Sequence, residues 1–385
     1  MKFMGYVRPD GRVGVRNHIA VIPASVCAAT VAARIAEQTE GAVALPNQHG
    51  CAQIGPDLDV TFRTLAGLGA NPNVGAVLVI GLGCESVQAD DLAREIAKSG
   101  KRTESLIIQK CGGTLKAQEQ GLRIARELSQ EVSKIARTEA DFSKLVLALE
   151  CGGSDTTSGL AANPVHGYVS DRLVEMGGAS ILSETTELIG AEHVLARRAV
   201  TKEIGDRLIE MVRACEAKAN AMGVDMRGSQ PTPGNIQGGL TTIEEKSLGC
   251  IYKGGSSPLQ GVLEYGEAPG GKGFYFMDTP GQDIESITGM VAGGAQVVIF
   301  TTGRGTPTGF PLAPVIKITG NPITFRLMEE NIDINAGTII EGTESIPQVG
   351  ERVLAEIEEV CNGKLTKAEA LKHMEFGIYK LTSTF

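Results

Sequence analysis

The chain has 385 residues, of which 42% are hydrophobic and 21% are charged, and it carries a formal net charge of −9 at pH 7. Because one hydrophobic core rarely serves so long a chain, we expect two domains. The acidic balance and the absence of a basic run argue against nucleic acid or an anionic membrane surface as the main partner. No apolar run in the sequence is long enough to cross a bilayer.

The N-terminus and the cysteines indicate the cellular compartment. Charged residues follow Met1 within the first dozen positions, a pattern that argues against a signal peptide. Eight cysteines in a chain of this length favour reduced thiols over a disulfide framework. We therefore expect a cytoplasmic protein.

Alternating strand and helix patterns begin after a short N-terminal arm. In this arm, residues 5–17, the side chains of Arg8, Arg12 and Arg16 either stay solvated or reach an anionic substrate or a partner subunit. Apolar runs predict strands at residues 19–22, 42–45, 76–80 and 106–108, and helical patterns follow at about 28–38, 57–66, 87–99 and 115–138. This order predicts a parallel sheet with right-handed crossovers, and we assign residues 1–140 to a first α/β domain.

The second half repeats the alternation from Lys144 onward. Strands are predicted at residues 146–149, 180–183, 274–277, 297–301 and 315–318, and helices at about 164–176, 197–221, 284–292 and 322–330. Residues 228–273 are rich in Gly, Pro, Ser and Thr and are predicted to form an insertion at the active edge. The predicted fold is α/β, with two doubly wound, mainly parallel-sheet (Rossmann-like) domains, of which the second spans residues 141–385.

Reactive side chains follow the ends of several predicted strands. They are Cys27, His49 and Cys51, Cys84 and Glu85, Cys111, and Glu150 and Cys151. In open parallel sheets the carboxyl ends of the strands meet at one crevice, so the sequence predicts one polar, thiol-rich pocket. Three thiolates with one open position would hold an iron ion or cluster that also touches a substrate, whereas any single cysteine is more often a small buried hydrophobe.

Two glycine-containing loops in the second half are candidate anion sites. Gly238 and Gly239 let backbone amides approach a ligand, and nearby Lys246 is a cation whose pKa falls when it is desolvated. Such a lysine suits a base that removes a proton next to a carboxylate, although an exposed lysine behind a helix cap fits the pattern as well. Residues 302–307 follow a buried strand and would form an anion cradle with Arg304. The sequence has neither a P-loop nor a GxGxxG motif after the first strand, which disfavours nucleotide binding.

Four longer strings, in chain order, resemble the altronate/galactarate dehydratase family, which also contains the large subunit of sulfolactate sulfo-lyase. They are GLGCE at 81–85, ECGGSD at 150–155, GGLTTIEEKSLG at 238–249 and TGRGTP at 302–307. The resemblance implies β-elimination from a 2-hydroxy acid, with dependence on divalent iron or manganese. Fused members carry a small SAF-type domain ahead of the arm that begins here at Gly5, so the resemblance also implies a separate small subunit.

On this basis we expect a metal-dependent lyase that eliminates water from a sugar acid and assembles as an oligomer. The alternatives are sulfite elimination from sulfolactate and a non-catalytic iron-binding subunit. Lys246 is the candidate base, and the other catalytic candidates are His49 and Glu85. The expected metal is iron, as Fe²⁺ or an iron–sulfur cluster, or else Mn²⁺, with the ligands Cys51, Cys84, Cys151 and Glu150. The substrate-binding candidates are Ser154, Asp155, Gly238, Gly239, Thr302, Gly303 and Arg304.

Overall fold

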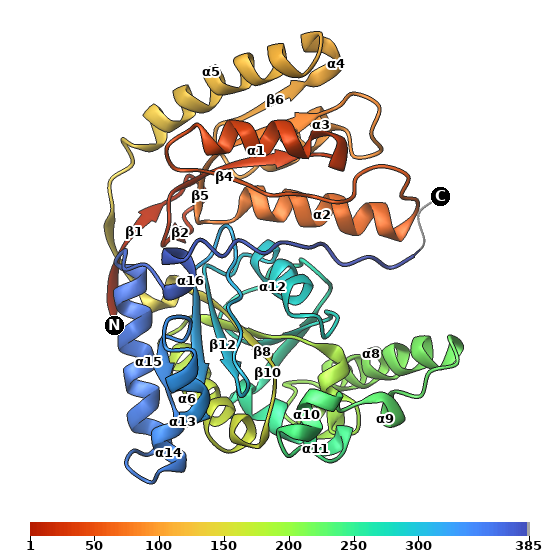
Figure 1. Cartoon of the computed structure of the whole chain (residues 1–385), viewed down its shortest axis with the longest axis vertical. Helices are drawn as coiled ribbons and strands as arrows, with labels where there is room; N and C mark the ends of the chain where they lie inside the picture. The colour runs from red at the N-terminus through yellow and green to blue at the C-terminus, as the bar shows by residue number, and fades with distance from the viewer. Residues whose placement is uncertain (383–385) are drawn as a thin grey trace.

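The structure is a computed structural model that describes residues 1–382, and it contains two parallel β-sheets flanked by helices (Figure 1). One sheet has four strands and the other has seven, and all strand pairs within both are parallel. The predicted α/β class with mainly parallel sheets is confirmed.

The small parallel sheet has the strand order β4 (Ala42–Ala44), β3 (His18–Pro23), β5 (Val74–Gly81) and β6 (Thr103–Ile107). Helices α1 (Ala29–Glu37) and α5 (Thr114–Val132) cover one face, and α2 (Pro56–Ala70) and α3 (Ala89–Ala97) cover the other. On β5, Val77 and Val79 share a core with α2 and α3, whereas Leu78 and Ile80 share one with α1 and α5. The strand is apolar without alternation because both of its faces are buried.

The large parallel sheet has the strand order β10 (Leu259–Leu263), β11 (Gly273–Met277), β9 (Ala179–Leu182), β8 (Val146–Gly152), β12 (Val297–Thr302), β13 (Val315–Thr319) and β14 (Ile334–Asn335). Helices α6 (Asn163–Glu175), α8 (Lys202–Ala221) and α15 (Ile346–Cys361) cover one face. Helix α12 (Asp283–Ala292) covers the other face and also packs against α2, so one hydrophobic core joins the two sheets. The division of the chain into domains near residue 140 stays a prediction.

Two predicted stretches differ from the structure. The helix expected at residues 115–138 ends at Val132, because residues 138–141 form β7 (Thr138–Asp141) in an antiparallel sheet with β1 (Lys2–Val7) and β2 (Val13–Gly14). The expected insertion contains α10 (Pro233–Gln237), α11 (Ile243–Ile251) and β10, and it begins within α9 (Met226–Ser229). Thr232 and Thr242 cap α10 and α11, so hydroxyl residues that suggested a loop are helix starts.

The remaining helices are short. Helix α4 (Ile108–Cys111) follows β6 of the small sheet. The others lie around the large sheet and are α7 (Glu192–Ala196), α13 (Pro322–Leu327), α14 (Gly337–Ile340) and α16 (Lys367–Ala370). Within residues 1–382, no helix is both long and apolar enough to cross a membrane.

The arginines of the N-terminal arm serve the fold. Arg8 is buried and donates to the carbonyl oxygens of Pro72 at 2.6 Å and Arg16 at 2.9 Å. Arg16 is also buried, and its guanidinium forms two hydrogen bonds of 2.7 and 2.8 Å with Glu369 of α16. These two side chains are neither solvated nor directed at a substrate, because they tie the arm to the small sheet and to the C-terminal segment.

Asn73 connects the two parallel sheets and provides a test of how they are joined. Its fully buried Nδ2 donates to the carbonyl oxygens of Gln296 at 2.8 Å and Leu312 at 2.9 Å, and its Oδ1 accepts from the amide of Val15 at 2.9 Å. We expect Asn73→Ala to lower the free energy of unfolding by about 2–4 kcal/mol, because buried polar groups lose their partners. Urea unfolding followed by circular dichroism measures this change. The exposed substitution Asn220→Ala in α8 is the control, and equal stabilities of the two variants would contradict the prediction.

Candidate functional site

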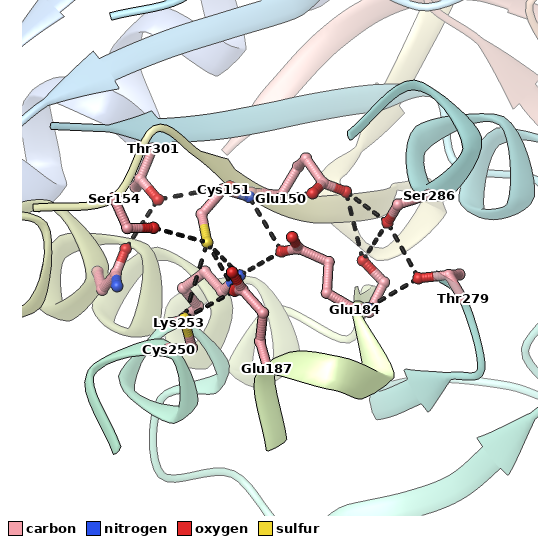
Figure 2. A network of polar contacts seen from close by, with 12 residues as sticks. Glu150, Cys151, Ser154, Glu184, Glu187, Cys250, Lys253, Thr279, Ser286 and Thr301 are labelled. Atoms are coloured by element: carbon pink, nitrogen blue, oxygen red, sulfur yellow. Dashed lines mark hydrogen bonds and ion pairs between the residues drawn. The ribbon is translucent and has the colours of Figure 1, made fainter. Parts of the chain in front are cut away.

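Buried carboxyl, thiol and ammonium groups gather at the carboxyl ends of β8 and β9 (Figure 2). β8 supplies a glutamate and a cysteine, and two more glutamates come from the segment after β9, which includes the turn η4 (Thr185–Leu188). A second cysteine comes from α11, and a lysine comes from the turn η5 (Tyr252–Gly254). We term these residues the acid–thiol cluster: Glu150, Cys151, Glu184, Glu187, Cys250 and Lys253.

Glu187 and Lys253 connect the members of the acid–thiol cluster. Glu187 Oε2 accepts from Cys250 Sγ at 2.7 Å and from Cys151 Sγ at 2.9 Å, and the two sulfur atoms are 3.8 Å apart. Lys253 Nζ lies 2.6 Å from Glu184 Oε2, 2.9 Å from Cys151 Sγ and 3.4 Å from Glu187 Oε2. One fully buried ammonium therefore joins two glutamates and the sulfur pair.

A second lysine reaches this cluster from α11. Lys246 Nζ is 3.2 Å from Glu187 Oε1. Burial by itself would lower the pKa of Lys246, but the Glu187 carboxylate raises it, and the net shift is upward. Burial would raise the pKa of Glu187, but Lys246 and Lys253 together bring it below its usual range. While Lys246 and Glu187 are paired, Lys246 is a charged ammonium. The expectation that desolvation lowers the pKa of Lys246 is therefore wrong.

The cluster and its neighbour Asp283 contain more carboxylates than cations. Burial raises the pKa of both Glu150 and Glu184, and burial together with the carboxylates of Glu184 and Glu187 raises that of Asp283 to about 7. Glu150 Oε2 accepts from Ser286 Oγ at 2.6 Å, which compensates part of its desolvation. Four carboxyl groups thus face two ammonium groups, and either protons or a divalent cation must balance the two extra negative charges.

Two sets of side chains have donor atoms close enough to hold a metal ion, since the atoms of each set lie within 4.8 Å of one another. The first set is Cys151, Glu187 and Cys250, and the second is Glu150, Glu184 and Asp283. Two thiolates bound at about 2.3 Å to a tetrahedral ion lie about 3.8 Å apart, which matches the 3.8 Å between the two Sγ atoms. Thiolates suit iron or zinc, and three carboxylates suit harder cations, so these residues fit a divalent metal.

A cavity of about 170 Å³ adjoins the acid–thiol cluster. Lys246 and Cys250 form part of its wall, so a molecule in the cavity would reach both the ammonium and one sulfur atom of the cluster. The rest of the lining includes the polar residues Ser154, Asp155, Thr156, Ser158, Asn163 and Glu245 and the apolar residues Leu160 and Leu240. The volume and the lining suit a small polar molecule.

Two of the predicted substrate-binding residues, Ser154 and Asp155, line this cavity, and two of the predicted glycines pack against Asp155. Asp155 lines the cavity, but its carboxylate accepts from Thr157 Oγ1 at 2.6 Å and Asn321 Nδ2 at 3.0 Å. A Cβ atom at Gly238 or Gly303 would lie 2.6 or 2.1 Å from side-chain atoms of Asp155, so both glycines allow close packing of the loops.

The other three predicted residues of this kind make local contacts. The Cβ atom of any residue replacing Gly239 would lie 2.4 Å from Thr156 Oγ1. Thr302 Oγ1 accepts from the amide of Gly305 at 2.9 Å, and the exposed Arg304 donates to the carbonyl oxygen of Gly234 at 3.2 Å. Their role toward a substrate stays a prediction.

Four other predicted site residues lie at the small sheet instead. Cys51 and Cys84 are exposed on loops after β4 and β5, and within residues 1–382 neither belongs to a set of donor atoms that includes Cys151. His49 Nε2 lies 3.2 Å from the carbonyl oxygen of Ile378, and Glu85 Oε2 accepts from the amide of Gly83 at 2.6 Å. The expectation of one common pocket is wrong because the strands belong to two sheets, and each sheet has its own carboxyl edge.

The sequence-based prediction missed Cys250, Lys253 and Asp283, whereas Glu184 and Glu187, beside a predicted strand end, fitted a helix cap as well as a metal ligand. Spacing was the available signal: Cys250 follows Lys246 by four positions and Lys253 follows Cys250 by three, which places all three on one face of a helical segment. Asp283 gave no such signal, because an acidic residue in the first turn of a helix is common for reasons of helix stability.

Both halves of the chain match a known enzyme family in sequence. Residues 142–384 match the family described as "D-galactarate/Altronate dehydratase, C-terminal", and residues 5–133 match "D-galactarate dehydratase/Altronate hydrolase, second domain". The chain therefore belongs to the galactarate/altronate dehydratase family, and it is an enzyme of the lyase class.

Individual relatives extend the similarity over nearly the whole chain. The chain is 40% identical to (2R)-sulfolactate sulfo-lyase subunit beta of Chromohalobacter salexigens, over 98% of this chain and 97% of the relative. It is 33% identical to altronate dehydratase of Bacillus subtilis, over 98% of this chain and 77% of the relative. It is 38% identical to galactarate dehydratase (L-threo-forming) of Escherichia coli, over 94% of this chain and 73% of the relative.

Removal of the buried ammonium tests the charge balance of the cluster. We expect Lys253→Met to lower the free energy of unfolding at pH 8 by about 3–5 kcal/mol, because Glu184 and Glu187 lose a partner inside the protein. Without Lys253 the pKa of these carboxyls in the folded state rises above that in the unfolded state, so the folded state takes up protons as the pH falls. The loss should therefore be smaller at pH 6 than at pH 8. Urea unfolding at both pH values measures it, with the exposed Lys272→Met as the control, and a pH-independent loss would contradict this account.

Proposed function

We propose that this chain is the catalytic part of a metal-dependent lyase that eliminates water from a sugar acid. The observation that carries the proposal is Lys246, whose ammonium lines a small polar cavity and is paired with Glu187 of the acid–thiol cluster. Loss of a proton next to a carboxylate builds up negative charge on an enediolate, and a fixed cation at that position stabilises it. The altronate and galactarate dehydratases among the relatives support the hydro-lyase assignment.

In this proposal Lys246 binds the carboxylate of the substrate and stays close to it as the enediolate forms. The hydroxyl groups of Ser154 and Thr156 on the same cavity wall suit the hydroxyl groups of a sugar acid. The role of base that the sequence suggests for Lys246 requires loss of its proton, and the pairing with Glu187 opposes that loss. We therefore favour an electrostatic role, and the arginine variant below separates the two roles.

We also propose that a divalent ion, iron or else manganese, binds to Cys151, Cys250 and Glu187. Bound there, the ion would supply positive charge at the cavity wall, which stabilises an enediolate and assists departure of a hydroxyl group. The softness of the two sulfur donors, their 3.8 Å separation and the excess of negative charge support this set of ligands.

A separate small subunit completes the proposed enzyme. One relative is named as subunit beta, and the chain spans 77% and 73% of the two dehydratase relatives described above. We therefore propose assembly with a small partner chain in the cytoplasm, in an oligomer. The experiments on activity use the chain both alone and with that partner.

The second candidate function is elimination of sulfite from (2R)-sulfolactate. The observation that favours it is the 40% identity to the sulfo-lyase subunit over nearly the full length of both chains. Both reactions share removal of a proton next to a carboxylate, so the same lysine and metal would serve either leaving group. A purely iron-binding role is the remaining alternative and predicts no turnover of either substrate.

A panel of substrates tests the proposed function and its second candidate. The complex is incubated anaerobically with aldonates, aldarates and (2R)-sulfolactate, and the 2-oxo acid product and sulfite are measured separately. Formation of a 2-oxo-3-deoxy acid supports the dehydratase, and release of sulfite supports the sulfo-lyase. If no member of the panel is converted with the metal and the partner present, the lyase proposal for these substrates is wrong.

Substitution of Lys246 tests its role in that reaction. We expect Lys246→Ala to lower kcat/KM by about 10²–10⁴-fold, the range for removal of a positioned catalytic group. Lys246→Arg keeps the positive charge but cannot lose its proton at neutral pH, so substantial recovery indicates an electrostatic role and no recovery indicates a base. Lys272→Ala is the control, because Lys272 is exposed and outside the lining of the cavity. Normal turnover by Lys246→Ala would remove this residue from the mechanism.

Removal of the metal tests the proposed ligands. A chelator should abolish activity, and Fe²⁺ or Mn²⁺ should restore it. In Cys250→Ser the concentration of metal that gives half of the activity should rise by about tenfold or more, because the softer sulfur ligand is lost. Cys215→Ser, a half-buried thiol of α8, should behave as the unaltered chain. Equal metal dependence of the two variants would contradict the ligand set.

A further inference from the structure

We propose that the carboxyl edge of the small parallel sheet is a second metal site, in which Cys27, Cys51 and Cys84 bind an iron–sulfur cluster. This site is distinct from the acid–thiol cluster, and its test reads out metal binding, so it stands or fails independently of the proposed lyase activity. The proposal is based on the order of the strands, the contacts between their loops and the exposure of the thiols.

A cysteine follows each of the four strands of the small sheet. The strands are parallel, so their carboxyl ends lie along one edge, where the cysteines occur in the spatial order Cys51, Cys27, Cys84 and Cys111. Cys111 Sγ is half-buried and donates to Gln120 Oε1 at 3.3 Å, whereas Cys84 Sγ is exposed and accepts a longer contact of 3.9 Å from Gln109 Nε2. The other three thiols belong to adjoining loops in the middle and at one end of that edge.

Backbone hydrogen bonds fix these three loops to one another. The amide of Val26, next to Cys27, donates to the carbonyl oxygen of His49 at 3.1 Å. The amide of Val87, three residues after Cys84, donates to the carbonyl oxygen of Gly50 at 3.0 Å. The loop that carries Cys51 is therefore held between the loops that carry the other two thiols.

The Cys51 loop is also packed too closely to move apart easily. Gly50 has a φ of +94°, and a Cβ atom there would lie 1.9 Å from the carbonyl oxygen of Ala24, so only glycine fits this contact. Asn47 is fully buried, and its Nδ2 lies 3.3 Å from the carbonyl oxygens of both Pro23 and His49. Buried contacts thus hold these loops in place, whereas the cysteines that they carry are exposed.

The exposure of the three thiols has no explanation in packing. Cys27, Cys51 and Cys84 are exposed, although free cysteines are among the most buried residues in proteins. Two polar atoms close to them in sequence, Ser25 Oγ and Glu85 Oε1, are buried and have no hydrogen-bond partner among the described residues. Buried polar atoms are rarely left unpaired, so this edge has the polar interior of a binding site.

The spacing of the thiols favours a cluster over a single ion. Ligand atoms around one tetrahedral ion lie about 4 Å apart. Within residues 1–382, the sets of side chains whose donor atoms lie within 4.8 Å of one another include none of these three cysteines. A cluster has several metal atoms and spans more widely separated thiolates, and three protein ligands would leave one iron open to a small ligand.

Anaerobic reconstitution tests the site. The full chain is treated with ferric iron, sulfide and a thiol reductant, which can supply the electrons for a mixed ferric and ferrous cluster, and excess reagents are removed. We expect a broad absorption band in the visible region and retained acid-labile sulfide, with at least as much iron as sulfide because the acid–thiol cluster can hold a further ion. The single variants Cys27→Ser, Cys51→Ser and Cys84→Ser should each lose most of the band and of the retained iron.

Two controls separate this site from other thiols. Cys111→Ser removes a thiol of the same edge that already has a partner, and Cys250→Ser removes one from the acid–thiol cluster, and both should keep the band. Because the three substituted cysteines are exposed, the variants should keep the circular dichroism spectrum and melting temperature of the parent chain. Absence of the band in the parent chain, its persistence in all three variants, or its loss in Cys250→Ser alone would overturn the proposal.

Discussion

The ion pairs of Lys253 are the interactions on which the rest of the candidate site depends. This lysine is fully buried and lies 2.6 Å from Glu184, 3.4 Å from Glu187 and 2.9 Å from Cys151 Sγ. Without Lys253, the buried carboxylates of Glu184 and Glu187 would take up protons, because desolvation and mutual repulsion both oppose their charge. Lys246 and Lys253 together keep Glu187 ionised, and an ionised Glu187 in turn accepts hydrogen bonds from both thiols.

The fold supplies this arrangement through the topology of the large sheet. β8 and β9 are adjacent and parallel, so the residues that follow them meet at the same edge, and α11 with η5 closes that edge from the side. The small sheet has its own edge with a different set of residues, exposed thiols in place of buried carboxyls. Because α12 and α2 pack between the sheets, one hydrophobic core joins them, and each sheet keeps its own carboxyl edge.

Local patterns predicted the class of fold and most of its regular elements. The unbroken apolar run at residues 76–80 correctly predicts a strand that is buried on both faces, and β5 has this property. Composition gave a wrong prediction where short helices begin with residue types that also favour turns. The threonines and glycines of residues 228–273 predicted a loop, but Thr232 and Thr242 cap helices. Strand ends also identified Glu150 and Cys151, whereas no local pattern states which strands share a sheet, so Cys51 and Cys84 were grouped with the wrong partners.

The two oxygen atoms of Glu187 couple the sulfur pair to the cavity. Oε2 contacts both thiols and Lys253, and Oε1 contacts Lys246, which lines the cavity. Positive charge added near the sulfur atoms reduces the negative potential that Glu187 exerts at Lys246, so the pKa of Lys246 then falls. The charge of the lysine in the cavity therefore depends on what occupies the sulfur pair, and Cys250 and Cys151 also act on the pKa of Lys246 through their own charge. A single carboxylate between two lysines is sufficient for this coupling, because each of its oxygen atoms serves one side.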